Sequence, residues 1–326
     1  NAPEWLLSDL GSVFAGGIAV GIYPTNSADA CKYIAQNCRA NIIVAEDERQ
    51  VDKILSIKKD LPDLLAVVQY TGTPTTPDVL SWSKLMEIGN TFEEGETELD
   101  ERLKGVAINQ CCHLVYTSGT TGNPKGVLYS HRSTIIHALA AGLPDTLNLS
   151  ARDSVLPVVP MFHVNAWGIP YTAALVGCKL VFPGPAMDGQ SVYDLIEGEG
   201  VTMAAGVPTV WQMLLAHMDK EGKRFSTLKR TVIGGSACPP AMYDRFVDQF
   251  GVQVLHAWGM TEMSPLGTVG VLKNQSGDPQ TQRTQLLKQG RPVFGVDMKI
   301  VDDAGQTQAW DGKATGNLLV RGPWIL

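Results

Sequence analysis

The chain has 326 residues, and its 33 Asp and Glu against 26 Lys and Arg give a formal net charge of −7. With 44% apolar and 18% charged residues it can bury the core of two or three domains, which excludes a disordered chain, and its 33 glycines without a three-residue period exclude a collagen-like repeat. The acidic balance argues against a surface that wraps nucleic acid or docks on an anionic membrane.

The first 110 residues alternate apolar runs with helical patterns. Helices are predicted over residues 7–19, 29–38 (capped by Ser27) and 48–59, and strands over 19–24, 41–45 and 65–70. This alternation is typical of βαβ units with a mainly parallel sheet. The acidic stretch at 90–105 is interpreted as a solvated linker or helix face.

The same alternation continues from residue 113. Strands are predicted over 113–116, 127–130, 155–159, 179–182, 202–204, 230–233 and 252–256, with helices over 133–142, 191–199, 208–219 and 240–249. After residue 272 short strands with turns follow, as expected for a small β-rich subdomain. The predicted fold class is therefore α/β, with two packed βαβ-type subdomains (1–110 and 111–272) and part of a small β-barrel (273–326).

Neither end of the chain has the polar, exposed character of most termini. The sequence begins without Met and ends on Trp324-Ile325-Leu326, which predicts a fragment of a longer protein, incomplete at both ends.

The six cysteines are scattered without the paired C-x2-C spacing of a zinc site, which favours free thiols in a reducing compartment. No apolar run reaches the roughly 18 residues that a bilayer crossing needs. We therefore expect a soluble, cytoplasmic protein, with peripheral membrane association left open.

The strongest local signal is a glycine- and hydroxyl-rich loop with a lysine at its end, Tyr116-Thr-Ser-Gly-Thr-Thr-Gly-Asn-Pro-Lys-Gly126. Its glycines free backbone N–H groups to face an anion, the hydroxyls add donors, and Lys125 supplies a positive charge for a phosphate. The spacing differs from that of the P-loop, and Lys125 is followed by Gly126 instead of Ser or Thr.

This loop closely resembles the signature loop of the adenylate-forming superfamily, which includes acyl-CoA synthetases, luciferases and peptide-synthetase adenylation domains. Further resemblances follow in the expected order along the chain, at Gly234-Gly235-Ser236-Ala237, at His256-Ala257-Trp258-Gly259-Met260-Thr261-Glu262, at Gly290-Arg291-Pro292 and at Gly316–Pro323. The resemblance covers essentially the whole chain.

Within the superfamily the chain is most similar to fatty acyl-CoA synthetases. Residues 1 to about 115 resemble bubblegum-type long-chain enzymes, and residues after about 125 resemble bacterial medium-chain and methylthiopropionate-type ligases. Because the change falls at the phosphate loop, we hypothesise a composite chain.

The resemblance implies two half-reactions: a carboxylate and Mg-ATP give an acyl-adenylate and pyrophosphate, and CoA then displaces AMP. The implied partners are thus small molecules (a fatty acid, ATP and CoA), with Mg²⁺ as cofactor and no nucleic acid. By resemblance the β- and γ-phosphates would be held by the signature loop, through Thr117, Ser118, Gly119, Thr120, Thr121, Gly122 and Lys125.

The later motifs carry the remaining implied roles. Thr261 would donate to the α-phosphate, Glu262 would hold Mg²⁺, and Trp258 would stack on the adenine where the family often has Tyr. The adenine site would be completed by Gly235, Ser236, Ala237, His256, Ala257 and Gly259. His163 matches a position associated with gating of the acyl site, whose walls are expected at Trp167, Gly168, Val207 and Gly234.

Two features keep alternatives open. The family's ribose-binding Asp segment, hinge and C-terminal lid domain do not occur before Leu326, so the chain could be a nucleotide- or lipid-binding fragment without turnover. An aryl-CoA ligase or an amino-acid-adenylating enzyme is the other alternative. An amino-acid activator usually has an Asp early in its pocket, and the segment 206–235 offers only Asp219, which favours an uncharged acyl tail.

Overall fold

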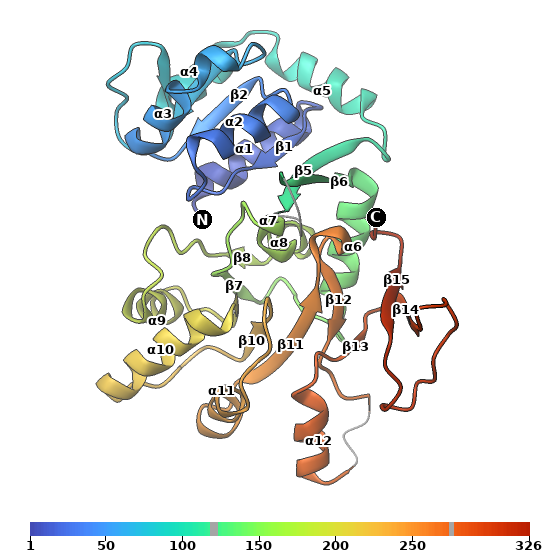
Figure 1. The fold of residues 1–326 in the computed structure, drawn as a ribbon. Helices are drawn as coiled ribbons and strands as arrows, with labels where there is room; N and C mark the ends of the chain where they lie inside the picture. Colours follow the sequence, from blue (N-terminus) through green and yellow to red (C-terminus); the bar gives the residue numbers. More distant parts are fainter. Residues whose placement is uncertain (118–122, 274–276) are drawn as a thin grey trace. The chain divides into compact units, whose positions relative to one another are not determined.

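The computed structural model describes residues 1–117, 123–273 and 277–326, and these form two compact units (Figure 1). The first unit is Pro3–Leu128, and the second unit is Asn1–Ala2 together with Tyr129–Leu326. The finer division at residues 110 and 272 stays a prediction.

The first unit contains two three-stranded sheets. One has the order β2-β3-β4 and is parallel throughout; the other has the order β1-β5-β6, with β1 parallel to β5 and Ala19 opposite His113. This confirms the predicted mainly parallel α/β pattern. Its elements are α1 (Pro3–Phe14), β1 (Ala19–Gly21), α2 (Ala28–Asn37), β2 (Ile42–Ala45), α3 (Glu48–Leu55), η1 (Lys58–Asp60), β3 (Ala66–Gln69), β4 (Val79–Ser81), α4 (Trp82–Thr91), α5 (Gly95–Gly105), β5 (Cys111–Thr117) and β6 (Lys125–Ser130), the last of which continues into the second unit.

Local chemistry explains where these helices begin and end. Helix α2 is capped as predicted, because the Ser27 side chain accepts the Ala30 N–H. Helix α1 ends at Phe14, earlier than predicted, since Gly16, two residues further on, takes a positive φ of 78°. The acidic stretch at 90–105 includes helix α5, which has no buried residue.

The second unit is built on a seven-stranded sheet of order β13-β12-β11-β10-β9-β7-β8. Strands β11, β10, β9, β7 and β8 are parallel, and β12 and β13 add an antiparallel edge. The elements are α6 (His131–Gly142), β7 (Ser154–Pro157), α7 (Val164–Trp167), α8 (Ile169–Val176), β8 (Lys179–Leu180), α9 (Gly189–Gly198), β9 (Met203–Gly206), α10 (Pro208–Glu221), β10 (Arg230–Ile233), α11 (Pro240–Asp244), η2 (Arg245–Gln249), β11 (Gln253–Gly259), η3 (Thr261–Met263), β12 (Leu266–Val269), α12 (Pro279–Leu286), β13 (Arg291–Pro292), β14 (Asp297–Val301) and β15 (Asn317–Arg321).

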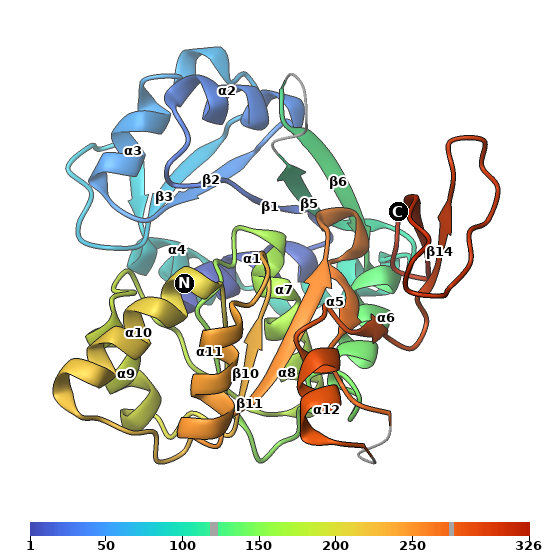
Figure 2. The same cartoon turned by 60° about the horizontal axis from the view of Figure 1, so that its bottom comes forward.

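Helices α9, α10 and α11 cover one face of this sheet (Figure 2). The core there joins Ile233 and Val254 of the strands to Trp211 and Phe246, whose rings meet edge to face at 6.0 Å. Side chains alternate along a strand, so Val232, next to Ile233, points to the opposite face of the sheet.

The segment after residue 272 contains a helix that the sequence analysis did not predict. Helix α12 follows an Asp278-Pro279 pair, in which the Asp278 carboxylate accepts the Thr281 N–H and proline takes the first helical position. The predicted strands are present as β14 and β15, an antiparallel pair with Asp297 opposite Arg321.

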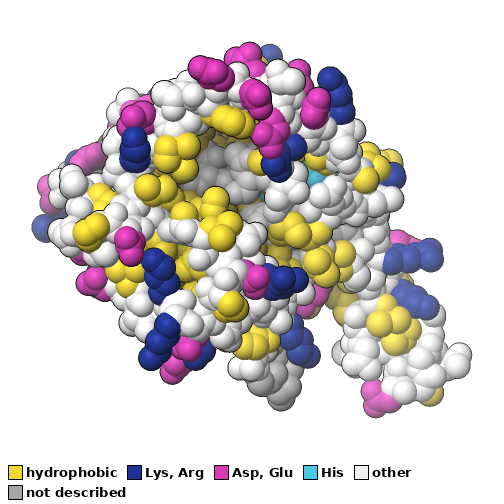
Figure 3. Space-filling model, turned by 90° about the horizontal axis from the view of Figure 1, so that it is seen from above, with side chains coloured by type: hydrophobic (Ala, Val, Ile, Leu, Met, Phe, Trp, Pro, Cys, Tyr) yellow, Lys and Arg dark blue, Asp and Glu magenta, His cyan; other side chains and the backbone are white. Residues whose placement is uncertain are grey.

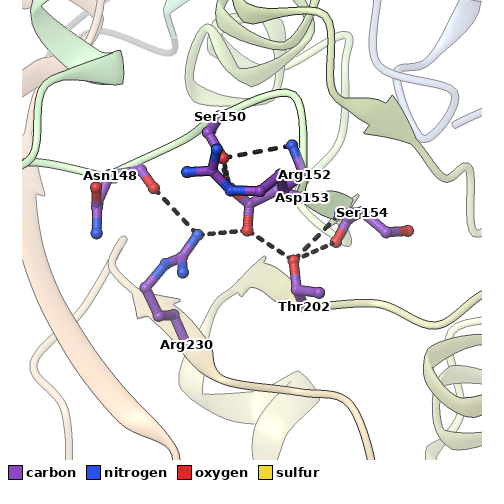
Figure 4. A network of polar contacts seen from close by, with 7 residues as sticks. All are labelled: Asn148, Ser150, Arg152, Asp153, Ser154, Thr202 and Arg230. Carbon is purple, nitrogen blue, oxygen red and sulfur yellow. Dashed lines mark hydrogen bonds and ion pairs between the residues drawn. The ribbon is translucent and has the colours of Figure 1, made fainter.

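A part-buried polar network lies at the amino ends of three parallel strands of the second unit (Figure 4). Asp153 precedes β7, Thr202 precedes β9 and Arg230 begins β10. The Asp153 carboxylate accepts hydrogen bonds from Arg230 and Thr202, both at 2.8 Å, and from the Ser150 N–H at 2.9 Å. Arg230 also donates to the Asn148 carbonyl at 3.2 Å. Burial would raise the pKa of Asp153, but these hydrogen bonds outweigh burial and hold that pKa below its usual range.

On the face drawn in Figure 3, Lys and Arg side chains lie among Asp and Glu instead of forming one basic field.

None of the six cysteines, all of which lie within the described ranges, forms a disulfide. Among the helices described, none combines the length and apolarity that a membrane crossing requires.

Candidate active site

A cavity of about 240 Å³ lies in the second unit, where β10 and β11 end. The carboxyl ends of parallel strands are where open α/β sheets bind ligands. The cavity is lined by Leu147, His163, Val164, Trp167, Ile169, Val232, Gly234, Gly235, Ala257, Trp258, Gly259, Met260, Thr261, Pro265 and Leu266. Eight of these were predicted as site residues: His163, Trp167, Gly234, Gly235, Ala257, Trp258, Gly259 and Thr261.

One wall is a left-handed turn of four consecutive residues that are not glycine, α7 (Val164–Trp167). Their φ angles are 49°, 48°, 48° and 59°, and Gly168 continues the turn at 72°. A left-handed conformation disfavours an L-residue by about 1–2 kcal/mol, so the surrounding packing has to hold this turn in place. Such strain concentrates at ligand sites.

Two glycines permit the close packing around this turn. A Cβ atom on Gly234 would lie 3.1 Å from Cη2 of Trp167 and 3.2 Å from the Ala257 carbonyl oxygen. A Cβ atom on Gly168 would lie 2.7 Å from Cε1 of the buried His137. The Trp167 indole therefore lies directly against the loop that follows β10.

Further lining residues come from β11 and the turn that follows it. Trp258 is half-buried and lines the cavity, so its ring is available to stack on a planar ligand. Thr261 begins the short helix η3 and lines the cavity beside Met260. His163 also lines the cavity, and burial lowers the pKa of its imidazole, which favours the neutral form at pH 7.

His256, predicted to complete the adenine site, does not line the cavity. It is 1% exposed, its Nε2 accepts the Cys238 N–H at 3.2 Å, and its Nδ1 lies 3.1 Å from the Leu287 carbonyl oxygen. Both ring nitrogens are thus bonded to backbone groups, and the side chain packs beneath the site without lining the cavity.

Other predicted residues also lie outside the cavity lining. Ser236 and Ala237 are exposed, Gly168 packs on His137, and Val207 lies beside Gly235. Glu262 is exposed next to Thr261. In the first unit Thr117 ends β5 and Lys125 begins β6. The predicted phosphate-binding residues Ser118, Gly119, Thr120, Thr121 and Gly122 lie outside the described residues.

The prediction missed seven lining residues: Leu147, Val164, Ile169, Val232, Met260, Pro265 and Leu266. Val164, Met260 and Pro265 lie in or beside motifs that the sequence analysis named, and Val232 stands at an alternating position of a predicted strand. Leu147 follows helix α6 in a loop without any sequence signal.

Glu262 is the residue predicted to hold Mg²⁺. Within the described part of the chain no three His, Cys, Asp or Glu side chains gather around a common point. Protein sites for Mg²⁺ with nucleotides use one or two carboxylates and complete the shell with water and phosphate oxygens. A single exposed carboxylate beside Thr261 fits that kind of site.

A cavity at the carboxyl ends of a parallel sheet, beside a glycine loop and the half-buried ring of Trp258, is typical of an α/β protein that binds a small molecule. The chain belongs to the AMP-binding enzyme family, whose profile matches residues 1–326.

The chain is 44% identical over 319 residues to the medium-chain-fatty-acid–CoA ligase of Ectopseudomonas oleovorans, an alignment that covers 96% of this chain and 57% of the relative. It is 50% identical over 252 residues to the 3-methylmercaptopropionyl-CoA ligase of Ruegeria lacuscaerulensis, covering 77% and 45% of the two chains. The crystal structure of the anthranilate CoA ligase AuaEII with anthranoyl-AMP has a TM-score of 0.80 and 25% identity, and covers 100% of this chain and 59% of that one.

These similarities confirm the predicted family resemblance and the α/β fold. The chain spans about half the length of the curated relatives it matches. One relative aligns along 96% of the chain, and the hypothesis of a composite chain stays a prediction.

Proposed function

We propose that this chain is the nucleotide- and acid-binding part of an AMP-forming fatty acid–CoA ligase. The observation that carries the proposal is the cavity at the ends of β10 and β11, which combines a stacking ring at Trp258 and a hydroxyl at Thr261 with apolar walls. The 44% identity to a medium-chain-fatty-acid–CoA ligase supports the reaction class.

The cavity chemistry suits an acid with an apolar tail. Trp167, Val232 and Leu266 line it with apolar surface, and each methylene group buried there contributes about 0.8 kcal/mol. No Asp, Glu, Lys or Arg is among the described lining residues, so a charged amino-acid side chain or ammonium group has no partner of opposite charge in the lining.

In the proposed first half-reaction, an oxygen of the acid attacks the α-phosphorus of ATP, and the bond from that phosphorus to the pyrophosphate oxygen breaks. The protein contributes mainly positioning and stabilisation of charge. Thr261 donates its hydroxyl to the α-phosphate and Trp258 stacks on the adenine. The role of Lys125, neutralisation of charge on the departing phosphates, is proposed on the family resemblance alone.

Glu262 is the carboxylate that would hold Mg²⁺, which neutralises phosphate charge when it is bound. The second half-reaction, in which the CoA thiol displaces AMP to form a thioester, is proposed for the whole protein on its similarity to acyl-CoA ligases.

The test is pyrophosphate release from ATP by the full-length protein, with straight-chain fatty acids from butyrate to palmitate and with benzoate, anthranilate and amino acids. The proposal predicts release and acyl-CoA formation with fatty acids. It predicts that Thr261→Val lowers kcat/KM by about 10- to 100-fold, because a hydrogen bond to a charged group is lost. The exposed Thr307→Val is the matched control and is expected to behave as wild type. Release with aryl or amino acids alone, or ATP binding without release for any acid, would overturn the proposal.

A further inference from the structure

The turn after β11 begins with Met260 and Thr261 and closes with Pro265 and Leu266, and these four residues line the cavity. It has little regular structure of its own. A single 3-10 turn, η3, is followed by Ser264 in the left-handed region at φ 64°. Interactions from outside the turn must therefore fix its conformation.

Two buried rings hold Leu266 by both of its backbone groups. The Leu266 N–H donates to Nε2 of His137 at 3.2 Å, and Nε1–H of Trp324 donates to the Leu266 carbonyl oxygen at 3.1 Å. The two rings contact each other edge to face, with centroids 5.9 Å apart and planes at 85°. The two rings therefore pack on each other while both bond to Leu266, a residue that lines the cavity.

The segment around Trp324 makes two further hydrogen bonds to the same turn. The Ser264 hydroxyl donates to the Trp324 carbonyl oxygen at 2.9 Å, and the Leu326 N–H donates to the Glu262 carbonyl oxygen at 3.0 Å. Residues 324–326 therefore hold Glu262, Ser264 and Leu266, which alternate along the turn.

These bonds are shielded from water. Trp324 is 1% exposed, His137 2% and Ser264 5%. Burial lowers the pKa of His137 to about 4, so its ring is neutral at pH 7 and its Nε2 can accept the hydrogen bond from the Leu266 N–H. An indole N–H can only donate, which makes the Leu266 carbonyl its matched partner.

We infer that Trp324 is a positioning residue for the nucleotide-binding turn: its indole N–H and its carbonyl fix Leu266 and Ser264, and through them the orientation of Thr261 and Glu262. Trp324 bonds to the turn and does not itself line the cavity. The inference rests on the proposed function for the part that concerns ATP.

The test uses the full-length protein with Trp324→Phe, which keeps an aromatic ring and removes the N–H, and Ser264→Ala, which removes the hydroxyl that donates to Trp324. Trp310→Phe is the matched control, since Trp310 is 69% exposed. Two quantities are measured well below the unfolding temperature of each variant: amide hydrogen exchange of residues 260–267, and kcat/KM for ATP in pyrophosphate release.

Exchange in the turn is expected to be about three- to tenfold faster in Trp324→Phe and Ser264→Ala, with a matching three- to tenfold fall in kcat/KM for ATP, because each variant loses one hydrogen bond. Faster exchange with unchanged kcat/KM for ATP would assign Trp324 a purely structural role and overturn the inference. So would wild-type exchange in both variants. If Trp324→Phe does not fold, Ser264→Ala decides the matter. If the proposed function is wrong, the wild-type protein itself does not release pyrophosphate, and this result is distinct from any effect of the variants.

Discussion

The hydroxyl of Tyr129 donates to the carbonyl oxygen of Thr261 at 2.6 Å, across 132 positions of sequence. Tyr129 is 3% exposed, and burial together with the nearby Glu262 carboxylate raises the pKa of its hydroxyl, which therefore keeps its proton and acts as a donor. The bond fixes the peptide between Thr261 and Glu262, the two residues proposed to meet ATP and Mg²⁺.

Removing this hydroxyl should therefore impair catalysis. Tyr129→Phe is expected to lower kcat/KM for ATP by about three- to tenfold, because one buried hydrogen bond contributes about 0.5–1.5 kcal/mol. The measurement is initial-rate pyrophosphate release against ATP concentration. Tyr193→Phe is the control, since Tyr193 donates to the Arg224 carbonyl on the surface at 2.9 Å. Equal losses in both variants would mean that the Tyr129 hydroxyl serves stability alone.

The fold could be predicted largely from apolar periodicity. Buried strands such as 230–233 are short runs bounded by polar or glycine residues, and the helix at 28–37 has a serine cap, so both signals are local. Helix α12 was missed because its mean composition is polar and its helical character depends on a capping Asp278-Pro279 pair instead of an apolar stripe.

The site was predictable where chemistry requires a particular residue type, as at Thr261 and Trp258. The site was not predictable where a residue's role depends on which residues it contacts in the folded chain. His256 stands in a family motif, but only the structure shows that its ring is bonded to Cys238 and Leu287. The contacts of Tyr129 and Trp324 with the turn join segments far apart in sequence, and periodicity carries no such information.

The network around Asp153 should be a large contributor to the stability of the second unit. The Asp153 and Arg230 side chains are 9% and 12% exposed, and removing one partner of a buried pair is destabilising by about 3–5 kcal/mol. Asp153→Asn is thus expected to lower the free energy of unfolding by about 3 kcal/mol in urea titrations. The exposed pair of Arg321 and Asp297 provides the control, and Asp297→Asn should change that free energy by less than about 1 kcal/mol. Similar values for the two variants would contradict this assignment.

His113 of the first unit should make stability depend on pH. It is 3% exposed; its Nε2 lies 3.3 Å from the Asp9 carboxylate, and its Nδ1 lies 3.2 Å from the Cys112 sulfur. Burial would lower the pKa of His113, but hydrogen bonds to Asp9 and Cys112 outweigh burial and raise it to about 9 from 6.5. Because the folded pKa lies above the unfolded one, the stabilisation is complete below pH 6.5 and is lost as the pH rises through about 9.

The expected loss across this window is about 3 kcal/mol in the free energy of unfolding. It is measured as the difference in pH dependence between wild type and His113→Asn, which cannot titrate there. Urea titrations at intervals between pH 6 and pH 10 give both curves, and subtraction removes the contribution of groups common to the two proteins. Parallel curves would show that folding does not raise the pKa of His113.

The left-handed turn predicts that the same substitution, alanine to glycine, has different effects at two buried positions. Ala166 and Ala204 are both 0% exposed, but Ala166 has a φ of 48° whereas Ala204 lies in strand β9. At either position, replacing alanine with glycine destabilises the fold by about 0.8 kcal/mol through the lost burial of a methyl group. The greater chain entropy of glycine costs about a further 0.5–1 kcal/mol. At Ala166 the substitution also relieves about 1–2 kcal/mol of strain in the left-handed conformation. Ala166→Gly should therefore leave the free energy of unfolding within about 1 kcal/mol of wild type, and Ala204→Gly should lower it by about 1.5 kcal/mol. Urea titrations of the two variants test this directly, and a larger loss for Ala166→Gly would mean that the turn carries no strain for glycine to relieve.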